Sequence, residues 1–429
     1  MVLRAMFSGV SGLRAESEAI GVVGDNIANV NTVGFKSQRA IFQDVLGHSI
    51  LAGTSSALPG SGVRVGDVQQ LFTQGSIANT GVSTDVALNG DGFLVVNGTV
   101  DGITSNFYTR AGQLTIDKEG FLVNHQNLNA QGYLANADGT LQASVSSLQV
   151  PTSSLAPFST TEMTVTANLD SRKPVQTFDI LDPEGTSSGT TSITVFDSLG
   201  TARTLDVYFS NQGGNLYQYN VVVDGAELAG GTPGATLVST GTLQFTTDGA
   251  LDAATTPALS LSFAGGATAN QAIELNFGDD IQNDGSTGLS GTTQFASETA
   301  VSSQSQDGYA SGEFSGLAID GTGLVQGLYT NGQKITIGQL AVAKFRSNDG
   351  LGRAGQNLWI ETRDSGTAAL GAAGAGGRAS VSAGALESSN VDLGEEFVGL
   401  IQHQRSFSAN SRTITTADEM LQELIGIKR

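Results

Sequence analysis

The stretch SGLRAESEAIGVVGDNIANVNTVGFKSQRA, residues 11–40, follows MVLRAMFSGV and decides how the N-terminal end of the chain folds. Apolar residues recur every three or four positions, which is the spacing of a helix with one apolar stripe. Asparagines then gather where the stripe ends, and such residues accept helix-terminal geometry and bond nearby carbonyls. We therefore predict a helix closed by a turn at Asn26, Asn29 and Asn31. The predicted stripe consists of Leu3, Met6, Val10, Leu13, Ile20 and Ile27.

The C-terminal end has the same spacing, in NVDLGEEFVGLIQHQRSFSANSRTITTADEMLQELI at residues 390–425. A narrow apolar stripe needs a partner, so neither helix is expected to be stable alone. Ser17, Gly24 and Gln404 fall on the seam and would weaken a tight two-stranded zipper. We predict that the two helices pair as a coiled-coil-like core that also contacts further neighbours. The C-terminal stripe consists of Phe397, Leu400, Phe407, Ile414, Leu421 and Ile425.

The residues between the two helices have the pattern of β structure. YQYNVVV at 217–223 and LSLSF at 259–263 alternate in side-chain character. Asp-Gly dipeptides, which favour hairpin turns, occur at residues 91, 138, 224 and 248. The 429 residues include 57 Gly but only 7 Pro, without a collagen period. We predict a mainly β protein with two sandwich-like or barrel-like domains and an α-helix at each end.

Charge is concentrated in the middle of the chain. The formal net charge is −20, and residues 146–308 alone hold three basic and seventeen acidic side chains. This segment is predicted to be a solvated outer domain. The negative charge would repel phosphate backbones and anionic lipid surfaces, so nucleic acid is not an expected partner.

Redox, metal and membrane functions find no support in the sequence. The chain has no Cys and three scattered histidines, His48, His125 and His403, so no metal or cofactor is expected. No basic cluster precedes an apolar run at the N-terminus, and no apolar segment reaches 18 residues. We expect neither a cleaved signal peptide nor membrane insertion.

Three strings that are suggestive of chemistry are better explained as loops. GTSSG at 185–189 matches the nucleophile pattern of hydrolases but lies among strand-forming residues. GAAGAGG at 371–377 lacks the strand and the GK[ST] of a phosphate-binding loop, and DDIQNDG at 279–285 lacks the acids of a calcium loop. No catalytic residue is assigned, and the protein is not expected to be an enzyme.

The N-terminal string closely resembles the signature of bacterial flagellar rod and hook proteins, and the string at 390–425 resembles the C-terminal helix of the same axial family. Asn26, Asn29, Asn31, Gly34 and Phe35 occupy the motif turn in this resemblance. GSIANTGVSTDVALNGDGFLVV at 75–96, YTRAGQLTIDKEGFLVN at 108–124 and QDGYASGEFSGLAIDGTGLVQGLYTNGQ at 306–333 resemble the family's inner β domain. The large insertion carries ITVFDSLGTARTLDVYF at 193–209, which is similar to the outer domain of hook proteins.

The resemblance and the composition together give a domain plan. The segments are an N-terminal helix (1–35), a connector (36–74), the first part of an inner β domain (75–145), an acidic outer β domain (146–305), the second part of the inner domain (306–364), a Gly/Ala/Ser connector (365–389) and a C-terminal helix (390–429). The fold of residues 225–295 stays open at this point.

The resemblance implies a structural subunit of the flagellar hook, which self-assembles into a flexible helical tube and acts as a universal joint. It further implies contacts with the distal rod protein, the hook cap protein and the hook–filament junction protein, and extracellular location after export through the flagellar type III machinery. The apolar stripes are then the assembly seam. Three other functions remain open: a distal rod protein, a secreted β-rich hydrolase using Ser187 or an Asp pair, and an adhesin.

Overall fold

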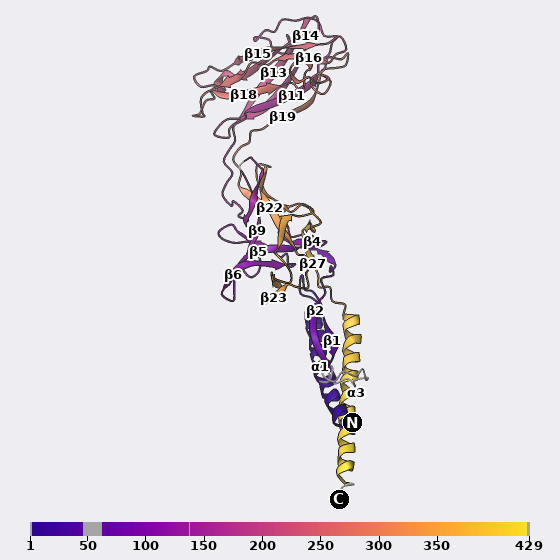
Figure 1. Cartoon of the computed structure of the whole chain (residues 1–429). Coiled ribbons are helices and arrows are strands. Elements are labelled where there is room, and N and C mark those ends of the chain that lie inside the picture. Colours follow the sequence, from indigo (N-terminus) through magenta and orange to yellow (C-terminus); the bar gives the residue numbers. More distant parts are fainter. Residues whose placement is uncertain (1, 46–61, 137, 427–429) are drawn as a thin grey trace. The chain divides into compact units, whose positions relative to one another are not determined.

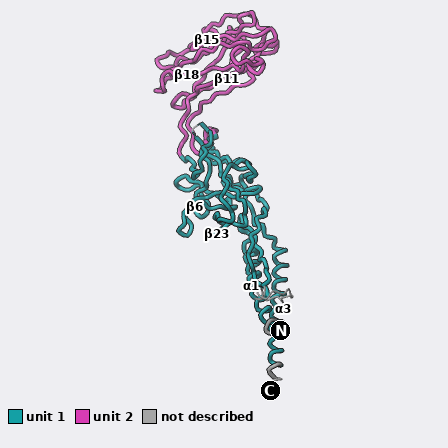
Figure 2. The backbone as a smooth tube through the Cα atoms, in the orientation of Figure 1, with its two compact units in different colours: residues 1–152, 316–328, 334–429 teal, residues 153–315, 329–333 magenta. Residues whose placement is uncertain are grey.

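The computed structural model describes residues 2–45, 62–136 and 138–426. The chain forms two compact units, shown in Figure 2. Unit 1 contains residues 1–152, 316–328 and 334–429, and unit 2 contains residues 153–315 and 329–333. Unit 1 is thus built from both ends of the chain, and unit 2 is inserted between them.

The terminal helices of unit 1 pack against each other (Figure 1). Helix α1 spans Val2–Ala28 and helix α3 spans Leu393–Gly426. Asp392 caps α3 because its Oδ1 accepts a hydrogen bond of 2.7 Å from the backbone N–H of Gly394. An antiparallel hairpin of β1 (Gln38–Asp44) and β2 (Val63–Gln70) packs on α1 as well. The predicted pairing of the two terminal helices is confirmed.

The β domain of unit 1 centres on a curled sheet whose main path runs β20-β21-β22-β9-β5-β6-β24-β23. β22 is the long central strand, and it pairs with β9, β5, β21 and β25. Two short antiparallel pairs, β26-β4 and β27-β3, join the end of the chain to its beginning. The strands are β3 (Ile77–Asn79), β4 (Val86–Asn89), β5 (Phe93–Val100), β6 (Ile103–Thr109), β7 (Thr115–Ile116), β8 (Leu122–Val123), β9 (Asn129–Ala135), β10 (Leu141–Ser147), β20 (Phe314–Ile319), β21 (Leu324–Tyr329), β22 (Lys334–Lys344), β23 (Gly352–Gly355), β24 (Leu358–Ile360), β25 (Ala369–Ala372), β26 (Ser380–Ala383) and β27 (Ala385–Glu387).

An aromatic cluster forms the core of this domain. Phe93 lies edge-on to Phe72, with ring centroids 5.6 Å apart, and 5.4 Å from the ring of Trp359. Tyr108 and Phe345 make a T-shaped pair at 4.7 Å. Buried aromatic rings contribute large apolar areas, so this cluster fixes strands from both halves of the chain in one core.

Unit 2 is a sandwich of two sheets. One has the strand order β17-β18-β11-β19 and the other β12-β13-β14-β15-β16. All pairings that the structure describes within them are antiparallel, apart from the parallel pair of β11 with β18. The elements are β11 (Glu162–Asn168), β12 (Gly189–Phe196), β13 (Ala202–Gly213), β14 (Leu216–Asp224), η1 (Gly225–Glu227), β15 (Ala235–Phe245), β16 (Leu251–Thr255), β17 (Leu259–Leu261), β18 (Gln271–Asn276), α2 (Ile281–Asp284) and β19 (Ala300–Gln306).

One continuous core lies between the two sheets of unit 2. β18 alternates buried and exposed residues along its whole length, as a strand with one solvated face should. Ile273 and Leu275 of β18 share this core with Tyr219 of the facing sheet. The ring of Phe277, directly after β18, lies 4.6 Å from that of Tyr219. The mainly β fold predicted from the sequence is confirmed, and residues 225–295 supply four strands and two short helical turns to it.

Two segments that the sequence predicts as connectors contain strands. The predicted connector at 36–74 holds β1 and β2, while residues 46–61 of it lie outside the described residues. The prediction of a Gly/Ala/Ser connector at 365–389 is wrong, because this segment contains β25, β26 and β27. Small side chains give this segment the composition of a linker. Backbone hydrogen bonds to β22, β4 and β3 nevertheless hold its three strands in place.

Candidate assembly surface

Small residues of α1 form its contact with α3. Gly9 and Gly12 are buried, and a Cβ atom on Gly12 would lie 2.6 Å from the Asn410 side chain. A Cβ on Gly9 would lie 2.9 Å from Ile414. The two helices therefore approach closely where α1 lacks side chains. The face continues with the buried residues Ala15, Ala19, Val23 and Asn26.

Ile414 is a predicted seam residue that lies in this contact, against Gly9, and the predicted seam residues as a set are only partly covered. On α1, Met6, Val10, Leu13, Ile20 and Ile27 are all half-buried. On α3, Leu400, Ile414 and Leu421 are half-buried, whereas Phe397 and Phe407 are exposed. The side chains of Leu3 and Ile425 lie outside the described residues. The structure thus puts small residues between the helices and leaves the large apolar residues partly open to solvent. The spacing of Gly9, Gly12, Ala15 and Ala19 was the available signal for this face.

The helix pair carries several large apolar side chains that a single chain does not cover. We call the set formed by Phe7, Phe397, Val398, Ile401 and Met420 the exposed helix patch. Val398 is 65% exposed and Phe7 is 64% exposed. Phe7 belongs to α1 and the other four residues to α3, and exposed large apolar side chains of this kind are typical of a surface that binds a partner.

One titratable pair bridges the helices. Nδ1 of His403 lies 2.7 Å from Oε2 of Glu16, and the imidazole stacks on the ring of Phe42 from β1, with 6.0 Å between centroids. His403 thus joins α3 to both α1 and the hairpin. The sequence assigned it no chemistry, and its position indicates a structural contact.

The asparagine turn connects α1, α3 and β1. Nδ2 of Asn26 donates to the carbonyl of Gln38 at 2.7 Å and to Oε1 of Glu396 at 2.8 Å, and its Oδ1 accepts from the N–H of Gln38 at 2.9 Å. Burial raises the pKa of the Glu396 carboxyl above its ordinary value. Asn29 caps the end of α1 by donating to the carbonyl of Asp25 at 2.9 Å. Asn31 is exposed and lies outside this network.

Gly34 allows the chain to turn into the β domain. Its φ of +70° is left-handed, and a Cβ would lie 2.6 Å from the backbone nitrogen of Ala111. Its N–H donates to the carbonyl of Glu387 at 2.8 Å, and the following Phe35 is buried. This turn therefore needs glycine for both backbone conformation and space.

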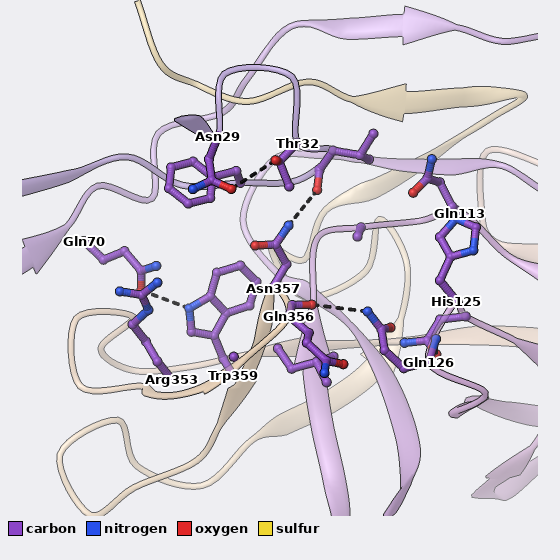
Figure 3. Close-up of a pocket in the computed structure, with 16 residues that line it drawn as sticks. Asn29, Thr32, Gln70, Gln113, His125, Gln126, Arg353, Gln356, Asn357 and Trp359 are labelled. Carbon is purple, nitrogen blue, oxygen red and sulfur yellow. Dashed lines mark hydrogen bonds between the residues drawn. The ribbon is translucent and has the colours of Figure 1, made fainter. Parts of the chain in front are cut away.

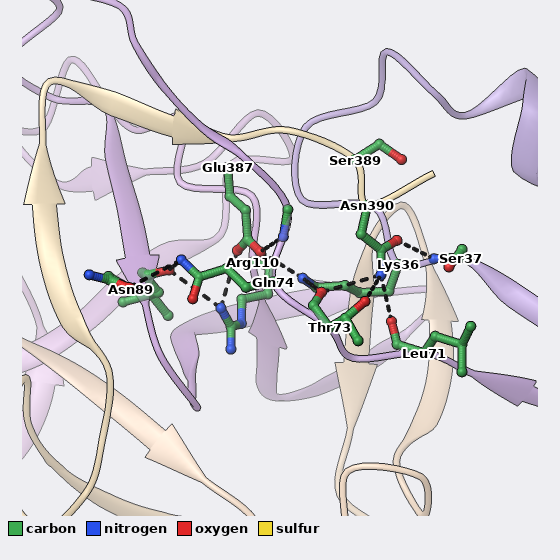
Figure 4. A network of polar contacts seen from close by, with 12 residues as sticks. Lys36, Ser37, Leu71, Thr73, Gln74, Asn89, Arg110, Glu387, Ser389 and Asn390 are labelled. Atoms are coloured by element: carbon green, nitrogen blue, oxygen red, sulfur yellow. Dashed lines mark hydrogen bonds and ion pairs between the residues drawn. The ribbon is translucent and has the colours of Figure 1, made fainter. Parts of the chain in front are cut away.

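A buried ionic cluster lies directly beyond the turn (Figure 4). The carboxylate of Glu387 pairs with Lys36 Nζ at 2.6 Å and with Arg110 Nη1 at 3.1 Å, and all three side chains are almost inaccessible to solvent. We call these three residues the ionic node. Lys36 also donates to the carbonyl of Thr73 at 2.7 Å, and the N–H of Gly75 donates to Glu387 Oε1 at 2.9 Å. Burial lowers the pKa of Lys36 from 10.5, against the opposing influence of the Glu387 charge.

Asn390 completes this junction before α3 begins. Its Oδ1 accepts from the N–H of Ser37 at 2.7 Å, and its Nδ2 donates to the carbonyl of Leu71 at 2.8 Å. Three segments distant in sequence are thereby tied together by buried polar groups. Sequence reasoning missed Lys36, Arg110, Glu387 and Asn390, since a charge pattern does not reveal which charges are buried together.

A polar pocket of about 390 Å3 lies beside the turn, between Asn29, Thr32 and the β23-β24 hairpin (Figure 3). Asn357 donates to the carbonyl of Val33 at 3.1 Å, and Trp359 Nε1 donates to Gln70 Oε1 at 2.9 Å. These contacts attach the hairpin to the asparagine turn and to β2.

The strings that were suggestive of chemistry have structural roles. Ser187 is half-buried and donates to the carbonyl of Glu184 at 3.3 Å. Asp280 caps α2, with Asn283 N–H donating to its carboxylate at 2.5 Å. Within residues 2–45, 62–136 and 138–426, His, Asp and Glu form no cluster of three suited to a metal ion. No helix in this part of the chain is long and apolar enough to cross a membrane.

Four family models match successive parts of the chain. The Flagella basal body rod protein model matches residues 6–36, and the Flagellar hook protein FlgE/F/G D1 domain matches 87–168. The Flagellar basal body protein FlaE D2 domain matches 168–309, and the Flagellar basal body rod FlgEFG protein C-terminal model matches 382–427. The matches cover most of α1, the first part of the β domain, most of unit 2 and α3.

Curated relatives match along nearly the whole chain. The flagellar hook protein FlgE of Treponema pallidum is 33% identical and that of Escherichia coli 35% identical, with 100% and 99% of this chain and 100% of each relative covered. FlgE of Salmonella typhimurium is 35% identical, with 98% of both chains covered. The crystal structure of Helicobacter pylori flagellar hook protein FlgE2 matches 71% of this chain and 98% of its own, with a TM-score of 0.51 and 14% identity, which supports the fold. The chain therefore belongs to the family of the flagellar hook protein FlgE.

Proposed function

We propose that this chain is the structural subunit of a bacterial flagellar hook, and that its copies assemble into a flexible helical tube which transmits torque from rod to filament. The observation that carries the proposal is the exposed helix patch on the paired terminal helices. A monomer leaves these side chains in water, and full burial of each would contribute about 1.5–3 kcal/mol. Assembly can therefore proceed without a bound ligand.

The seam residues have a second role in this proposal. Met6, Val10 and Leu13 are half-buried within one chain, so neighbouring copies can cover their remaining surface. Because Gly9 and Gly12 already set the distance between α1 and α3, contacts between copies can shift without opening the pair. Such shallow contacts suit a tube that bends while it rotates.

Unit 2 supports the flexible-tube proposal through its charge. Residues 146–308 carry seventeen acidic and three basic side chains. Copies of this unit repel one another within the screening distance of about 8–10 Å, so they resist fixed mutual packing. We propose that contacts between these units rearrange as the tube bends.

The family suggests the remaining partners and the location. We propose contacts with the distal rod protein, the hook cap protein and the hook–filament junction protein at the ends of the tube. We further propose that the chain reaches the flagellum through the type III export machinery without a cleaved signal peptide. A chain with no Cys can pass through that route without forming disulfides.

Electron microscopy of the concentrated full-length protein tests the proposed function. Curved, flexible tubes are expected. Straight, stiff tubes would indicate a rod protein instead, and persistent monomers under conditions that order the helices would contradict assembly. Val398→Asp should abolish tubes, because it places a charge in the exposed helix patch. Leu181→Asp, at a 90% exposed position of unit 2, is the matched control and should leave tubes intact.

A further inference from the structure

The polar pocket shown in Figure 3 has donor groups that its own chain leaves without acceptors. Arg353 uses Nη1 to donate to Gln38 Oε1 at 2.8 Å, while its other nitrogens and the His125 ring make no hydrogen bond within the described part of the chain. The side-chain amide of Gln113 makes no hydrogen bond in the described part of the chain either. Neither Asp nor Glu is among the residues that line the pocket. Its chemistry therefore favours a carboxylate or a peptide carbonyl.

The backbone of one wall is unusual as well. Gln356 and Asn357, the turn residues between β23 and β24, have φ values of +52° and +59°. Non-glycine residues rarely adopt this conformation, and it is retained where the surroundings fix it. Here the contacts of Asn357 with Val33 and of Gln356 with Gln126 fix the wall. The pocket is thus preformed, and its volume of about 390 Å3 is large enough for several side chains.

The β5-β6 hairpin offers a matching occupant. Residues 103–106 are all exposed, so both faces of the outer part of β6 lie open. A strand covered by its own domain on one face would instead have alternating buried and exposed side chains. Ile103 at the tip is 62% exposed, and Asp101 carries the only charge between Phe93 and Thr109. The φ values of Asp101 and Gly102, +49° and +80°, give a tight turn that presents the carboxylate at the end of the hairpin.

The hairpin cannot fill the pocket of its own chain. Thr109 of β6 pairs with Leu358 of β24, which lines the pocket. Gly102 lies seven residues further along the strand, which corresponds to roughly 23 Å at about 3.3 Å per residue. Bringing the tip back would require β5 and β6 to separate along their length. An occupant from a second copy has no such constraint.

We propose that the β5-β6 hairpin tip of one copy inserts into the polar pocket of a second copy, with the Asp101 carboxylate received by Arg353 and His125. This inference rests on the proposed function, because it requires copies to assemble. The two surfaces differ, so the contact is head-to-tail, and a head-to-tail contact that does not close produces an open helix. It would add a contact between β domains to those made by the helices.

Disulfide trapping tests the contact directly, because the chain has no Cys of its own. An Ile103→Cys chain and a Gln113→Cys chain are mixed, assembled and oxidised, and the disulfide-linked heterodimer is counted by mass. Assembled neighbours hold the two thiols at millimolar effective concentration. We expect roughly tenfold more heterodimer than from Ile103→Cys mixed with Glu119→Cys, whose second cysteine lies on the same unit outside the pocket.

Charge exchange supplies an independent measurement on the full-length chain. Asp101→Arg and Arg353→Glu should each raise the protein concentration needed for assembly about fivefold, and the double variant should restore it, since the pair is then reversed. Two outcomes would overturn the hairpin contact alone. The first is tubes that form without more heterodimer than the control, and the second is a double variant that needs as high a protein concentration for assembly as the single variants. Wild-type protein that never assembles would overturn both this contact and the proposed function.

Discussion

Glu387→Gln is the most informative single change in this chain, because it removes the only anion of the ionic node. The wild-type carboxylate holds Lys36 Nζ at 2.6 Å and Arg110 Nη1 at 3.1 Å in a site closed to water. A glutamine keeps the shape of the side chain but leaves two buried cations. Its amide also turns a hydrogen-bond donor toward groups that can only donate.

The expected loss is large on the scale of a folded domain. Removing one partner of a buried ion pair costs about 3–5 kcal/mol, because the remaining charge stays desolvated. A domain has about 5–15 kcal/mol of stability in all. We therefore expect Glu387→Gln to lower the unfolding midpoint of unit 1 by roughly 10 °C. Adding Lys36→Met should recover part of this loss, since the unpaired ammonium is then absent.

The loss should depend on pH in a defined direction. Burial lowers the pKa of Lys36 from 10.5 in the folded chain, so the unfolded chain binds more protons between the two values. Stability therefore rises with pH through that window. The Glu387 charge raises the pKa of Lys36, so the variant lowers it further and widens the window. The difference between wild type and variant should be greatest below the folded-state pKa of Lys36 and should shrink as the pH rises toward 10.5.

Tryptophan fluorescence during urea unfolding measures this effect in unit 1 alone. Trp359 is the single tryptophan of the chain, and it is buried in the core of that unit. Arg172→Gln is the matched control, because it breaks an ion pair with Asp170 that lies in unit 2 and is largely exposed on the arginine side. A loss below about 1 kcal/mol in Glu387→Gln, or a double variant less stable than the single one, would refute the reasoning.

Three further changes have defined outcomes. Leu13→Asp or Leu400→Asp should leave a soluble protein with folded β units that does not polymerise, and sedimentation with electron microscopy would detect any normal tubes. Gly34→Ala should destabilise unit 1 by about 2 kcal/mol or more, because alanine is strained at a φ of +70° and its Cβ would collide with backbone atoms of Arg110 and Ala111. Urea unfolding followed by Trp359 fluorescence measures this loss, and an unchanged unfolding midpoint would contradict it. The hydrogen bond from Arg172 lowers the pKa of Asp170 from 3.8 to about 2, so this pair stabilises unit 2 above pH 3.8 and loses that contribution as the pH falls toward about 2. Circular dichroism should therefore show a shallower acid dependence in Asp170→Asn than in wild type.

The helices could be predicted from the sequence because their stripes are long and regular. The contact face between them was not predicted, since apolar spacing draws attention to large side chains. In the structure Asn410 packs directly against Gly12, and the large residue Phe397 remains exposed. The apolar spacing of one sequence is the same for residues that pack within the chain and for residues that contact another copy.

Turn signals predicted hairpins with mixed success. The dipeptide at 248–249 joins the paired strands β15 and β16, as expected. The dipeptide at 91–92 lies between β4 and β5, which do not pair with each other, because β4 pairs with β26 near the other end of the chain. A local turn preference fixes the backbone over a few residues but leaves the pairing partner undetermined. This limit also explains why residues 365–389 were taken for a connector.

The ionic node was beyond sequence reasoning for a related reason. Lys36, Arg110 and Glu387 are separated by 74 and 277 residues, so only the finished fold brings them together. Their positions nevertheless explain how the ends of the chain act as one structure. Glu387 is the last residue of β27 and precedes α3, while Lys36 follows α1 and the asparagine turn. A force applied to either terminal helix reaches the β domain through this buried cluster, Asn390 and Gly34, and also through the contacts of the β23-β24 hairpin with Val33 and Gln70. A buried ionic contact resists such a force well because separating it exposes unpaired charges to a medium without water. We infer that the helices and the β domain of unit 1 move together when the proposed tube bends, and that rearrangement occurs at contacts between copies.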